Sequence, residues 1–518
     1  MSDDQTFADA IEGYCGGLSH RPGDAVPVHV SSRSERFSLT VERWGAERQL
    51  MWSIVDQPGQ FIAPPADADS HGCGWPETLR IPTDTTWPSG FYLVTFVAAD
   101  GADGTRTSHA GFVLRAGPQP HQALLVLATN TWNAYNTWGG RSLYTGGSQV
   151  SFGRPFARGM LSRPATERDD RKARPVYTGE PPDVDGTIFQ KYRTAHNYPS
   201  AIGSTGWFTH ERRFVEWAEG AGYRFDYAVS SDLETDPNIL DGYDLVINVG
   251  HDEYWSRGQR ECIDSFGANG GAVASLSGNT MFWQVRLERT DRGLAMVCFK
   301  YRAHLDDPVV GTDRQETMTG MWADPLVGQP EWSLLGAGSA FGLYARFGAA
   351  TPQGVGGFIV YRTDHWLLDG TGLNYGDVLG RDDGIVGYET VGCPLQLDDL
   401  GLPVAADRPD LPSETTIVAV TPTSNLRVGQ YPASIAALSD QGDAEFIAER
   451  VFGGINDHNL ARATHGNAVM MTSRPWGAAG GDMIVCGSTD WVFGLGDPQV
   501  ARVTANILDR YLSSTAAR

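Results

Sequence analysis

The sequence has none of the short motifs that mark the commonest catalytic and cofactor sites. It contains no HExxH zinc motif, no Walker phosphate loop and no GxSxG nucleophile elbow. Its 12 histidines form no pair with the spacing of a zinc site, and its six cysteines include no CxxC. The sequence therefore gives no support to the standard zinc-peptidase, P-loop or serine-nucleophile mechanisms.

Long apolar runs and an excess of basic charge are also missing. No apolar stretch approaches membrane-spanning length, and the start, MSDDQTFADAIEGY, lacks the basic and apolar regions of a signal peptide. The formal net charge of -22 repels phosphate backbones and anionic lipids. We therefore expect no nucleic-acid partner and no membrane partner. The scattered cysteines favour reduced thiols and a cytoplasmic protein.

Length and patterning predict more than one domain. The chain has 518 residues, 41% of them hydrophobic, which exceeds one ordinary core. Residues 11–115 alternate apolar and polar side chains between turn residues, as in SERFSLTVERWG and SGFYLVTFVAADG. This pattern predicts a β-sandwich. We expect an immunoglobulin-like β-sandwich domain over residues 1–118 and a second domain with long insertions over residues 119–518.

The second region alternates predicted strands with predicted helices. ALLVLAT is a continuous apolar run, typical of a strand covered on both faces. HERRFVEWAEGAGY, RGQRECIDSFGANGG and PQVARVTANILDRYL show helical spacing. This order predicts an α/β core with a parallel sheet. Residues 139–204, rich in Arg, Pro and Gly, predict an insertion or a lid, and residues 285–387 are expected to be strand-rich with long loops.

Three predicted strands end in unusually polar and aromatic sequence. TNTWNAYNTW, GHDEYWS and SGNTMFW follow the apolar runs 124–128, 245–249 and 273–276. In an open parallel sheet, ligands bind beyond the carboxyl ends of the strands. If the three strands are neighbours, these side chains converge on one cleft: Tyr135, His251, Glu253, Tyr254, Ser277 and Asn279.

Each of these residues also has an ordinary structural explanation. Tyrosine is common at strand ends, where its hydroxyl reaches water. His251 could be a buried, hydrogen-bonded histidine. Asp252 and Glu253 could be first-turn carboxylates of a helix capped by Ser256, and Asn279 could be a turn residue. The coincidence of three such strand ends favours a functional site.

Five separated stretches carry a resemblance to a known family. They are IEGYCGGLSHRPGD, ATNTWNAYNTWGGRSLY, GHDEYWS, GGAVASLSGNTMFWQVR and GSTDWVFGLGDPQVARVTANILDRY. In this order they resemble the large (beta) subunit family of N,N-dimethylformamidase over most of the chain. The resemblance implies a class I glutamine amidotransferase-like core domain. It also implies a metal-dependent hydrolase that cleaves the C–N bond of a small linear amide.

The resemblance implies a mononuclear ferric iron held by two tyrosines and one glutamate. Tyr135 and Tyr254 stand where the two tyrosines are expected, and Glu316, in TDRQETMTGMW, stands where the glutamate is expected. Glu389, in GIVGYET, resembles an acid next to the metal ligands. Phenolate and carboxylate oxygens are hard ligands that suit ferric iron. Three protein ligands leave coordination positions for water and substrate.

The remaining roles rest on position alone. His251 or Glu253 could move a proton to the departing amine, and Asn279 could orient the substrate or stabilise an oxyanion. The expected partners are a small amide substrate and either further copies of the chain or a small accessory subunit. Two other functions stay open. One is another hydrolase or lyase on the same scaffold, and the other is a non-catalytic protein that binds a carbohydrate-type ligand.

Overall fold

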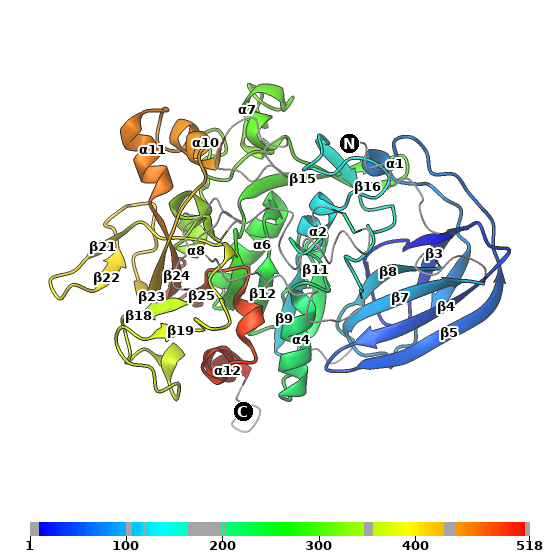
Figure 1. Cartoon of the computed structure of the whole chain (residues 1–518), viewed down its shortest axis with the longest axis horizontal. Coiled ribbons are helices and arrows are strands. Elements are labelled where there is room, and N and C mark those ends of the chain that lie inside the picture. The colour runs from blue at the N-terminus through cyan, green and yellow to red at the C-terminus, as the bar shows by residue number, and fades with distance from the viewer. Residues whose placement is uncertain are drawn as a thin grey trace, which may run out of the picture. The chain divides into compact units, whose positions relative to one another are not determined.

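The chain is described here by a computed structural model that covers residues 10–99, 106–117, 121–163, 198–199, 202–346, 356–428 and 442–512 (Figure 1). It divides into two compact units. Unit 1 contains Met1–Asp169, Arg193–Asp232 and Arg286–Cys298, and unit 2 contains Asp170–Tyr192, Leu233–Val285 and Phe299–Arg518. The predicted domains 1–118 and 119–518 stay a prediction, because the division into units follows other borders.

Two sheets form the first part of unit 1. The first has the order β1-β3-β6, with β1 (Ile11–Cys15), β3 (Ala25–Ser32) and β6 (Leu79–Pro82). The second has the order β2-β8-β7-β4-β5, with β2 (Ser19–His20), β8 (Thr107–Leu114), β7 (Gly90–Ala98), β4 (Arg36–Trp44) and β5 (Arg48–Pro58). Neighbouring strands are antiparallel except β2 and β8. The short helix α1 (Ala68–His71) precedes β6.

The two sheets share one hydrophobic core. Buried side chains reach it from both sheets, among them Val28 of β3 and Phe96 of β7. In β4, Phe37, Leu39 and Val41 are buried and alternate with the half-buried Ser38 and Thr40, and Trp44 at the end of the strand is buried as well. The predicted alternation in this strand is therefore confirmed, because one face of β4 packs on the core. The immunoglobulin-like topology stays a prediction.

Unit 1 also contains a parallel strand pair and a small antiparallel sheet. β9 (Ala123–Leu127) pairs in parallel with β11 (Asp226–Val229), and α2 (Thr129–Tyr135) follows β9. The helix predicted from HERRFVEWAEGAGY is α4 (Glu211–Gly220). β10 (Gln149–Ser151) pairs with β16 (Gly293–Val297), which pairs with the end of β15 (Trp283–Thr290). Much of the predicted insertion 139–204 lies outside the described residues, namely 164–197 and 200–201.

Seven strands of unit 2 follow one another in one mixed sheet. In order they are β12 (Leu245–His251), β14 (Ala272–Gly278), β25 (Met483–Cys486), β24 (Gly466–Ser473), β23 (Thr415–Thr423), β18 (Phe358–Val360) and β19 (Val378–Leu379). β12, β14 and β25 are parallel, whereas the remaining pairs are antiparallel. The glutamine amidotransferase-like core stays a prediction.

Two helices of unit 2 confirm the helical patterns in the sequence. α6 (Arg257–Ala268) begins after Ser256, whose hydroxyl accepts a hydrogen bond from the Gln259 N–H, so Ser256 is its N-cap. α12 (Pro498–Leu512) buries Val500 and Ile507 on one face. Both helices are amphipathic, as the spacing of their apolar residues predicts.

The other elements of unit 2 are short. They are β13 (Tyr254–Ser256), η2 (Lys300–Arg302), α7 (Ala303–Asp306), η3 (Gln315–Thr317), α8 (Trp332–Leu335), η4 (Ser339–Phe341), β17 (Tyr344–Arg346), η5 (Trp366–Leu368), β20 (Tyr388–Glu389), β21 (Leu395–Leu397), β22 (Pro403–Ala405), α10 (Asp443–Arg450), α11 (Asp457–Thr464) and η6 (Trp491–Gly494). The one-turn helix α5 (Asp232–Thr235) begins at the last residue of a unit 1 segment. The described residues of the range 285–387, expected to be strand-rich, thus mix strands with single helical turns.

All six cysteines lie among the described residues, and none forms a disulfide. Cys262 is half-buried in α6, and the other five are buried. Within the described ranges, no helix has both the length and the apolar composition to cross a membrane.

Candidate functional site

Two parallel strands of unit 2 bring their carboxyl ends together. β12 and β14 are neighbours, and their register pairs His251 with Gly278. Glu253 follows His251 by two residues, and Asn279 comes directly after β14. Because the ends of parallel strands lie at one edge of a sheet, His251, Glu253 and Asn279 start from the same edge, as the sequence predicts. Their catalytic roles stay predictions.

Glu389 of β20 reaches the same place from far along the chain. A Cβ atom on Gly278 would lie 2.1 Å from the Glu389 carbonyl oxygen and 2.4 Å from the Thr489 nitrogen. The Thr489 N–H donates to that carbonyl at 3.0 Å. The absence of a side chain at Gly278 therefore lets the backbone of Glu389 pack directly against the end of β14.

His251, Glu253 and Glu389 form a buried group, which we call the His251 group. The His251 Nε2 atom lies 2.6 Å from Glu389 Oε2 and 3.3 Å from Glu253 Oε2. The three residues are only 1%, 3% and 4% exposed. Burial by itself lowers the pKa of His251, but the two carboxylates, Glu389 first, outweigh it and raise the pKa to about 10.

A second layer of side chains holds the two carboxylates in place. The Trp283 indole N–H donates to Glu253 Oε1 at 2.8 Å. The Asn279 Nδ2 group donates to Glu389 Oε2 at 3.3 Å, and the Ser339 hydroxyl donates to Asn279 Oδ1 at 2.7 Å. The Asn279 backbone is left-handed, with φ of 51°, which fits the turn interpretation as well. Asn279 is therefore both a turn residue and a side-chain partner of Glu389.

Polar side chains also link β12 to β14 behind these ends. Asn248 Nδ2 donates to Asp252 Oδ2 and to Ser277 Oγ, both at 3.0 Å. Burial raises the pKa of Asp252 to about 7, although hydrogen bonds from Trp255 and Asn248 oppose the rise. Ser277, predicted to line a cleft, is thus enclosed in a buried network.

Two predicted metal ligands of unit 2 have very different surroundings. Tyr254 is fully buried on β13, and the Lys300 ammonium lies 5.8 Å from the centre of its ring. Glu316 lies on η3, where its side chain is exposed. An exposed carboxylate and a fully buried phenol make a poor pair for one ion, since the exposed group keeps its hydration. The ligand roles of both residues stay predictions.

The third predicted ligand, Tyr135, belongs to unit 1. It ends α2, is 6% exposed and stacks on Tyr144 with the ring centres 4.0 Å apart. Stacking holds the phenol ring in one orientation. The ligand role of Tyr135 stays a prediction.

The sequence pattern assigns no role to two residues of the site, Trp283 and Ser339. Trp283 lies in the aromatic stretch after β14, but nothing there distinguishes it from the neighbouring aromatic residues as a partner of Glu253. Ser339 follows a glycine in a loop-rich stretch, 60 residues after Asn279. The partners of both residues are set by packing between distant segments, which the local sequence does not encode.

The His251 group can do two kinds of chemistry. An imidazole between two carboxylates can hold and release a proton at Nε2. The same atoms can also ligate a cation, because one nitrogen and two carboxylate oxygens lie within 4.8 Å of one another. Among the described residues, these three side chains form the one group of His, Cys, Asp and Glu residues that lie close enough together to hold a metal ion.

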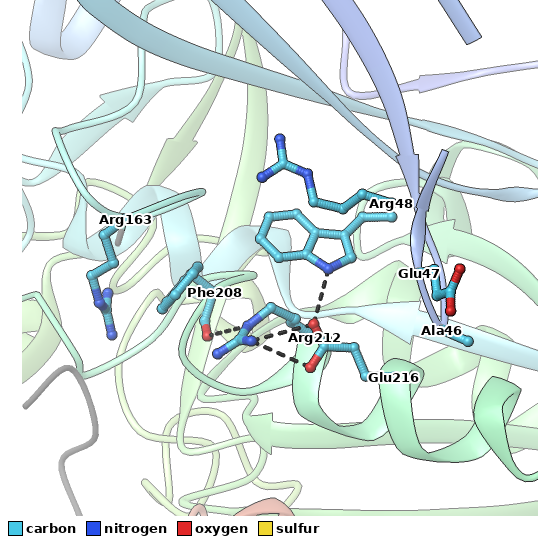
Figure 2. A pocket seen from close by; sticks show the side chains of 8 residues that line it. Ala46, Glu47, Arg48, Arg163, Phe208, Arg212 and Glu216 are labelled. Carbon is cyan, nitrogen blue, oxygen red and sulfur yellow. Dashed lines mark hydrogen bonds and ion pairs between the residues drawn. The ribbon is translucent and has the colours of Figure 1, made fainter. Parts of the chain in front are cut away.

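Unit 1 holds a cavity of about 560 Å³ (Figure 2). Its walls are Trp44, Ala46, Glu47, Arg48, Arg163, Phe208, Arg212 and Glu216. The guanidinium groups lie over aromatic rings, with Arg48 4.8 Å from the centre of Trp44 and Arg212 4.1 Å from that of Phe208. Glu216 accepts hydrogen bonds from the Trp44 indole and from Arg212. No predicted site residue lines this cavity.

Comparison with known proteins finds a family whose model matches this chain and a curated protein with a similar sequence. The N,N-dimethylformamidase beta subunit of Paracoccus aminophilus is 24% identical over 339 residues, which are 61% of this chain and 38% of the relative. The chain thus spans well under half the length of that relative. A chain from a study of T cell specificity and activation by the bacterial superantigen toxic shock syndrome toxin-1 is 14% identical. That match covers 21% of this chain and 98% of the other, with a TM-score of 0.14, and it carries no argument.

The family model covers most of both units and begins after β3. It is described as N,N-dimethylformamidase beta subunit-like, C-terminal, and it matches residues 38–504. That range contains all the residues of the His251 group and its hydrogen-bonding partners. The chain therefore belongs to the N,N-dimethylformamidase beta subunit-like family.

Proposed function

We propose that this chain is a metal-dependent hydrolase that cleaves the C–N bond of a small linear amide, N,N-dimethylformamide or a close analogue. Water adds across the bond, so the products are a carboxylic acid and an amine. Family membership supports the reaction class. The observation that carries the proposal is the His251 group, in which one imidazole and two carboxylates are buried together with ligand atoms within 4.8 Å.

The carboxylates of the His251 group fit an iron ion. Carboxylate oxygen favours hard cations such as ferric iron, and the neighbouring imidazole carries the proton. The protonated His251 balances one of the two carboxylates, so one buried negative charge is left for a cation to balance. We propose mononuclear iron as the resident metal on these grounds.

We infer that the carboxylate ligand is Glu253, not Glu316. Glu253 is buried beside His251, and its second oxygen is held by the Trp283 indole. Hydrogen bonds of this kind orient metal-binding carboxylates in proteins. Glu316 is exposed, so binding there would not exclude water. Tyr254, in the same unit, keeps its proposed role as a phenolate ligand, and the ligand role of Tyr135, in unit 1, stays a prediction.

We propose separate roles in the reaction for a bound ion, His251, Asn279 and Glu389. A bound ion supplies Lewis-acid activation of the amide carbonyl and of water. His251 holds a proton at Nε2 between two carboxylates and can deliver it to the departing amine nitrogen. Asn279 holds Glu389 against His251, and Glu389 keeps the imidazole in the orientation needed for that transfer.

We further propose that the chain acts in an assembly. The Paracoccus relative is described as a beta subunit, and such a name implies further chains in that enzyme. For this chain we propose either a small accessory subunit or further copies of itself. The native mass of the protein purified from its own cells measures this directly, and a mass equal to one chain would contradict it.

Metal content and amide hydrolysis test the main proposal. We expect about one iron per chain by elemental analysis, and release of dimethylamine from N,N-dimethylformamide. A protein that holds iron but cleaves no amide in a panel of linear amides would point to another hydrolase or lyase. A protein that takes up no metal under any loading condition would favour the non-catalytic, ligand-binding alternative.

Paired glutamate variants test the ligand assignment. Glu253→Gln and Glu389→Gln keep the size of the side chain but remove a charge, so we expect iron content to fall at least about tenfold. Glu316→Gln makes the same change at an exposed turn and should keep full iron content. Loss of iron in Glu316→Gln, with retention in Glu253→Gln, would restore Glu316 as the ligand.

A further inference from the structure

A chain of buried hydrogen bonds runs from η4 to the His251 group. Ser339 begins η4 and is fully buried. Its hydroxyl lies 2.7 Å from Asn279 Oδ1, the Asn279 Nδ2 atom lies 3.3 Å from Glu389 Oε2, and that oxygen lies 2.6 Å from His251 Nε2. Each member of the chain is at most 4% exposed, so water competes little for these contacts.

The chemistry of the groups fixes the direction of this chain. A carboxylate oxygen only accepts hydrogen bonds, so Asn279 must turn its NH2 group toward Glu389. Its carbonyl oxygen then faces Ser339, and the Ser339 hydroxyl must be the donor. If the amide were reversed, a carbonyl oxygen would face a carboxylate oxygen in a buried space, which is strongly unfavourable. The Ser339 hydroxyl therefore favours the amide orientation in which Asn279 donates to Glu389.

The position of Ser339 is itself held from two sides. Its backbone N–H donates to Glu331 Oε1 at 3.2 Å. The preceding residue, Gly338, exchanges backbone hydrogen bonds with Gly392, at 2.7 and 3.0 Å. A Cβ atom on Gly338 would lie 2.5 Å from Glu331 Oε1, so this backbone passes directly over the buried carboxyl group. These contacts fix the position of Ser339, whose hydroxyl in turn orients the Asn279 side chain.

We propose that Ser339 is a positioning residue of the hydrolase, acting through Asn279 to hold Glu389 against His251. The inference rests on the proposed function. In the proposed mechanism these contacts position the pair that transfers the proton, and none of them is assigned to substrate binding. Loss of the Ser339 hydroxyl therefore lowers kcat and leaves KM close to that of the wild-type protein.

Three substitutions at position 339 test the role of the hydroxyl on the full-length, iron-loaded protein. Ser339→Ala removes it, Ser339→Cys replaces it by a weak donor of nearly equal shape, and Ser339→Thr keeps it. We expect kcat for amide hydrolysis to fall about tenfold to a hundredfold in the Ala and Cys variants, with substantial recovery in the Thr variant. Ser333→Ala is the control, because the Ser333 hydroxyl donates to the Pro330 carbonyl and accepts from the Arg260 guanidinium instead of bonding to Asn279. Wild-type kcat in both the Ala and Cys variants would overturn the proposal.

A double-mutant cycle separates this inference from the proposed function. Asn279→Gly removes the amide and accepts the left-handed backbone at that position. If Ser339 acts through Asn279, Ser339→Cys lowers the melting temperature of the wild-type protein but lowers that of Asn279→Gly at most about a third as much. Equal drops in both backgrounds would overturn the proposal. This readout needs no substrate, so it holds even if the protein hydrolyses no amide and the proposed function fails.

Discussion

Glu331 is a fully buried carboxyl group at the start of α8. Burial raises its pKa to about 7, although backbone N–H donors and the charge of Arg260 oppose the rise. The Ser339 N–H donates to one of its oxygens. The folded protein therefore favours the protonated form of this residue over a wide pH range.

The raised pKa of Glu331 predicts a pH-dependent stability. The pKa of Glu331 in the folded protein lies above the ordinary value of 4.5. The contribution of its protonated side chain to the free energy of unfolding is therefore fully present below about pH 4.5 and is lost as pH rises through about 7. Glu331→Gln is neutral at every pH, so we expect it to gain stability relative to wild type between pH 5 and 8. This gain in the free energy of unfolding of the variant relative to wild type is at most about 3 kcal/mol. Urea unfolding of both proteins at pH 5 and pH 8 measures this difference.

The control for Glu331 is Glu316→Gln, which removes a carboxylate from an exposed turn of the same unit. Its stability relative to wild type should change little between the two pH values. An equal effect of Glu331→Gln at pH 5 and pH 8 would show that the buried carboxyl is ionised throughout.

At the scale of elements, the junction of β14 with β20 positions the site. β12 and β14 are joined by regular parallel pairing, but β20 is only two residues long. Besides its pairing with β17, it is held beside β14 by the backbone contact at Gly278 and by the Thr489 N–H that donates to Glu389. A small change at this junction therefore moves a residue of the His251 group.

We predict that Gly278→Ala disrupts this junction. The new methyl group would lie 2.1 Å from the Glu389 carbonyl oxygen, and two segments of backbone cannot yield as a flexible side chain would. We expect a loss of about 1–3 kcal/mol in the free energy of unfolding, together with reduced iron content. Denaturant unfolding and elemental analysis of the same preparation measure both effects.

Gly496→Ala is a suitable control for Gly278→Ala. It lies in the same unit, and a Cβ atom there would meet no heavy atom within 4 Å. The control should unfold like wild type and keep its iron. Equal behaviour of the two variants would mean that β20 does not pack on Gly278 as described.

At the scale of the whole molecule, the two compact units are interleaved along the chain. Unit 1 takes the segment Arg286–Cys298 from the middle of unit 2's sequence. That segment contains β16, which pairs with β10, and Arg292, which donates to the Gly72 carbonyl at 2.8 Å. A single cut of the chain therefore cannot separate complete units.

This arrangement predicts the behaviour of fragments. Residues 1–232 alone lack the β15–β16 hairpin, so β10 loses its strand partner in unit 1. We expect this fragment to be cleaved by protease much faster than the same region of the full chain. Joining residues 286–298 to it through a flexible Gly/Ser linker should restore protection. Equal protection of the fragment with and without the hairpin would contradict the prediction.

The local patterns of the sequence were sufficient for several elements. α6 and α12 follow from helical spacing, and the alternation in β4 follows from a strand with one face on a core. The polar residues that follow β12 and β14 in the sequence also predict that the two strand ends share one edge of a sheet. These features depend on neighbouring residues, so local sequence carries the information.

The site required more than these patterns. The family resemblance is the only sequence feature that points to Glu389, and no sequence feature assigns a role to Trp283 or Ser339. The resemblance points to Glu316 as a ligand. The sequence around Glu316 does not alternate apolar and polar residues, so it gives no indication that this side chain is exposed. Each of these depends on which distant segments pack together.

By itself, the sequence determined an acidic chain of the N,N-dimethylformamidase beta subunit-like family, with buried strands whose ends carry His251, Glu253 and Asn279. Periodicity and composition determine such features because they act over a few residues. Only the tertiary structure decided that Glu389 meets His251, 138 residues before it, and that Ser339 meets Asn279. The first contact depends on Gly278, which lets the backbone of Glu389 approach β14 closely. The second depends on Glu331 and on the Gly338–Gly392 hydrogen bonds, which place Ser339, so both are properties of the packed fold.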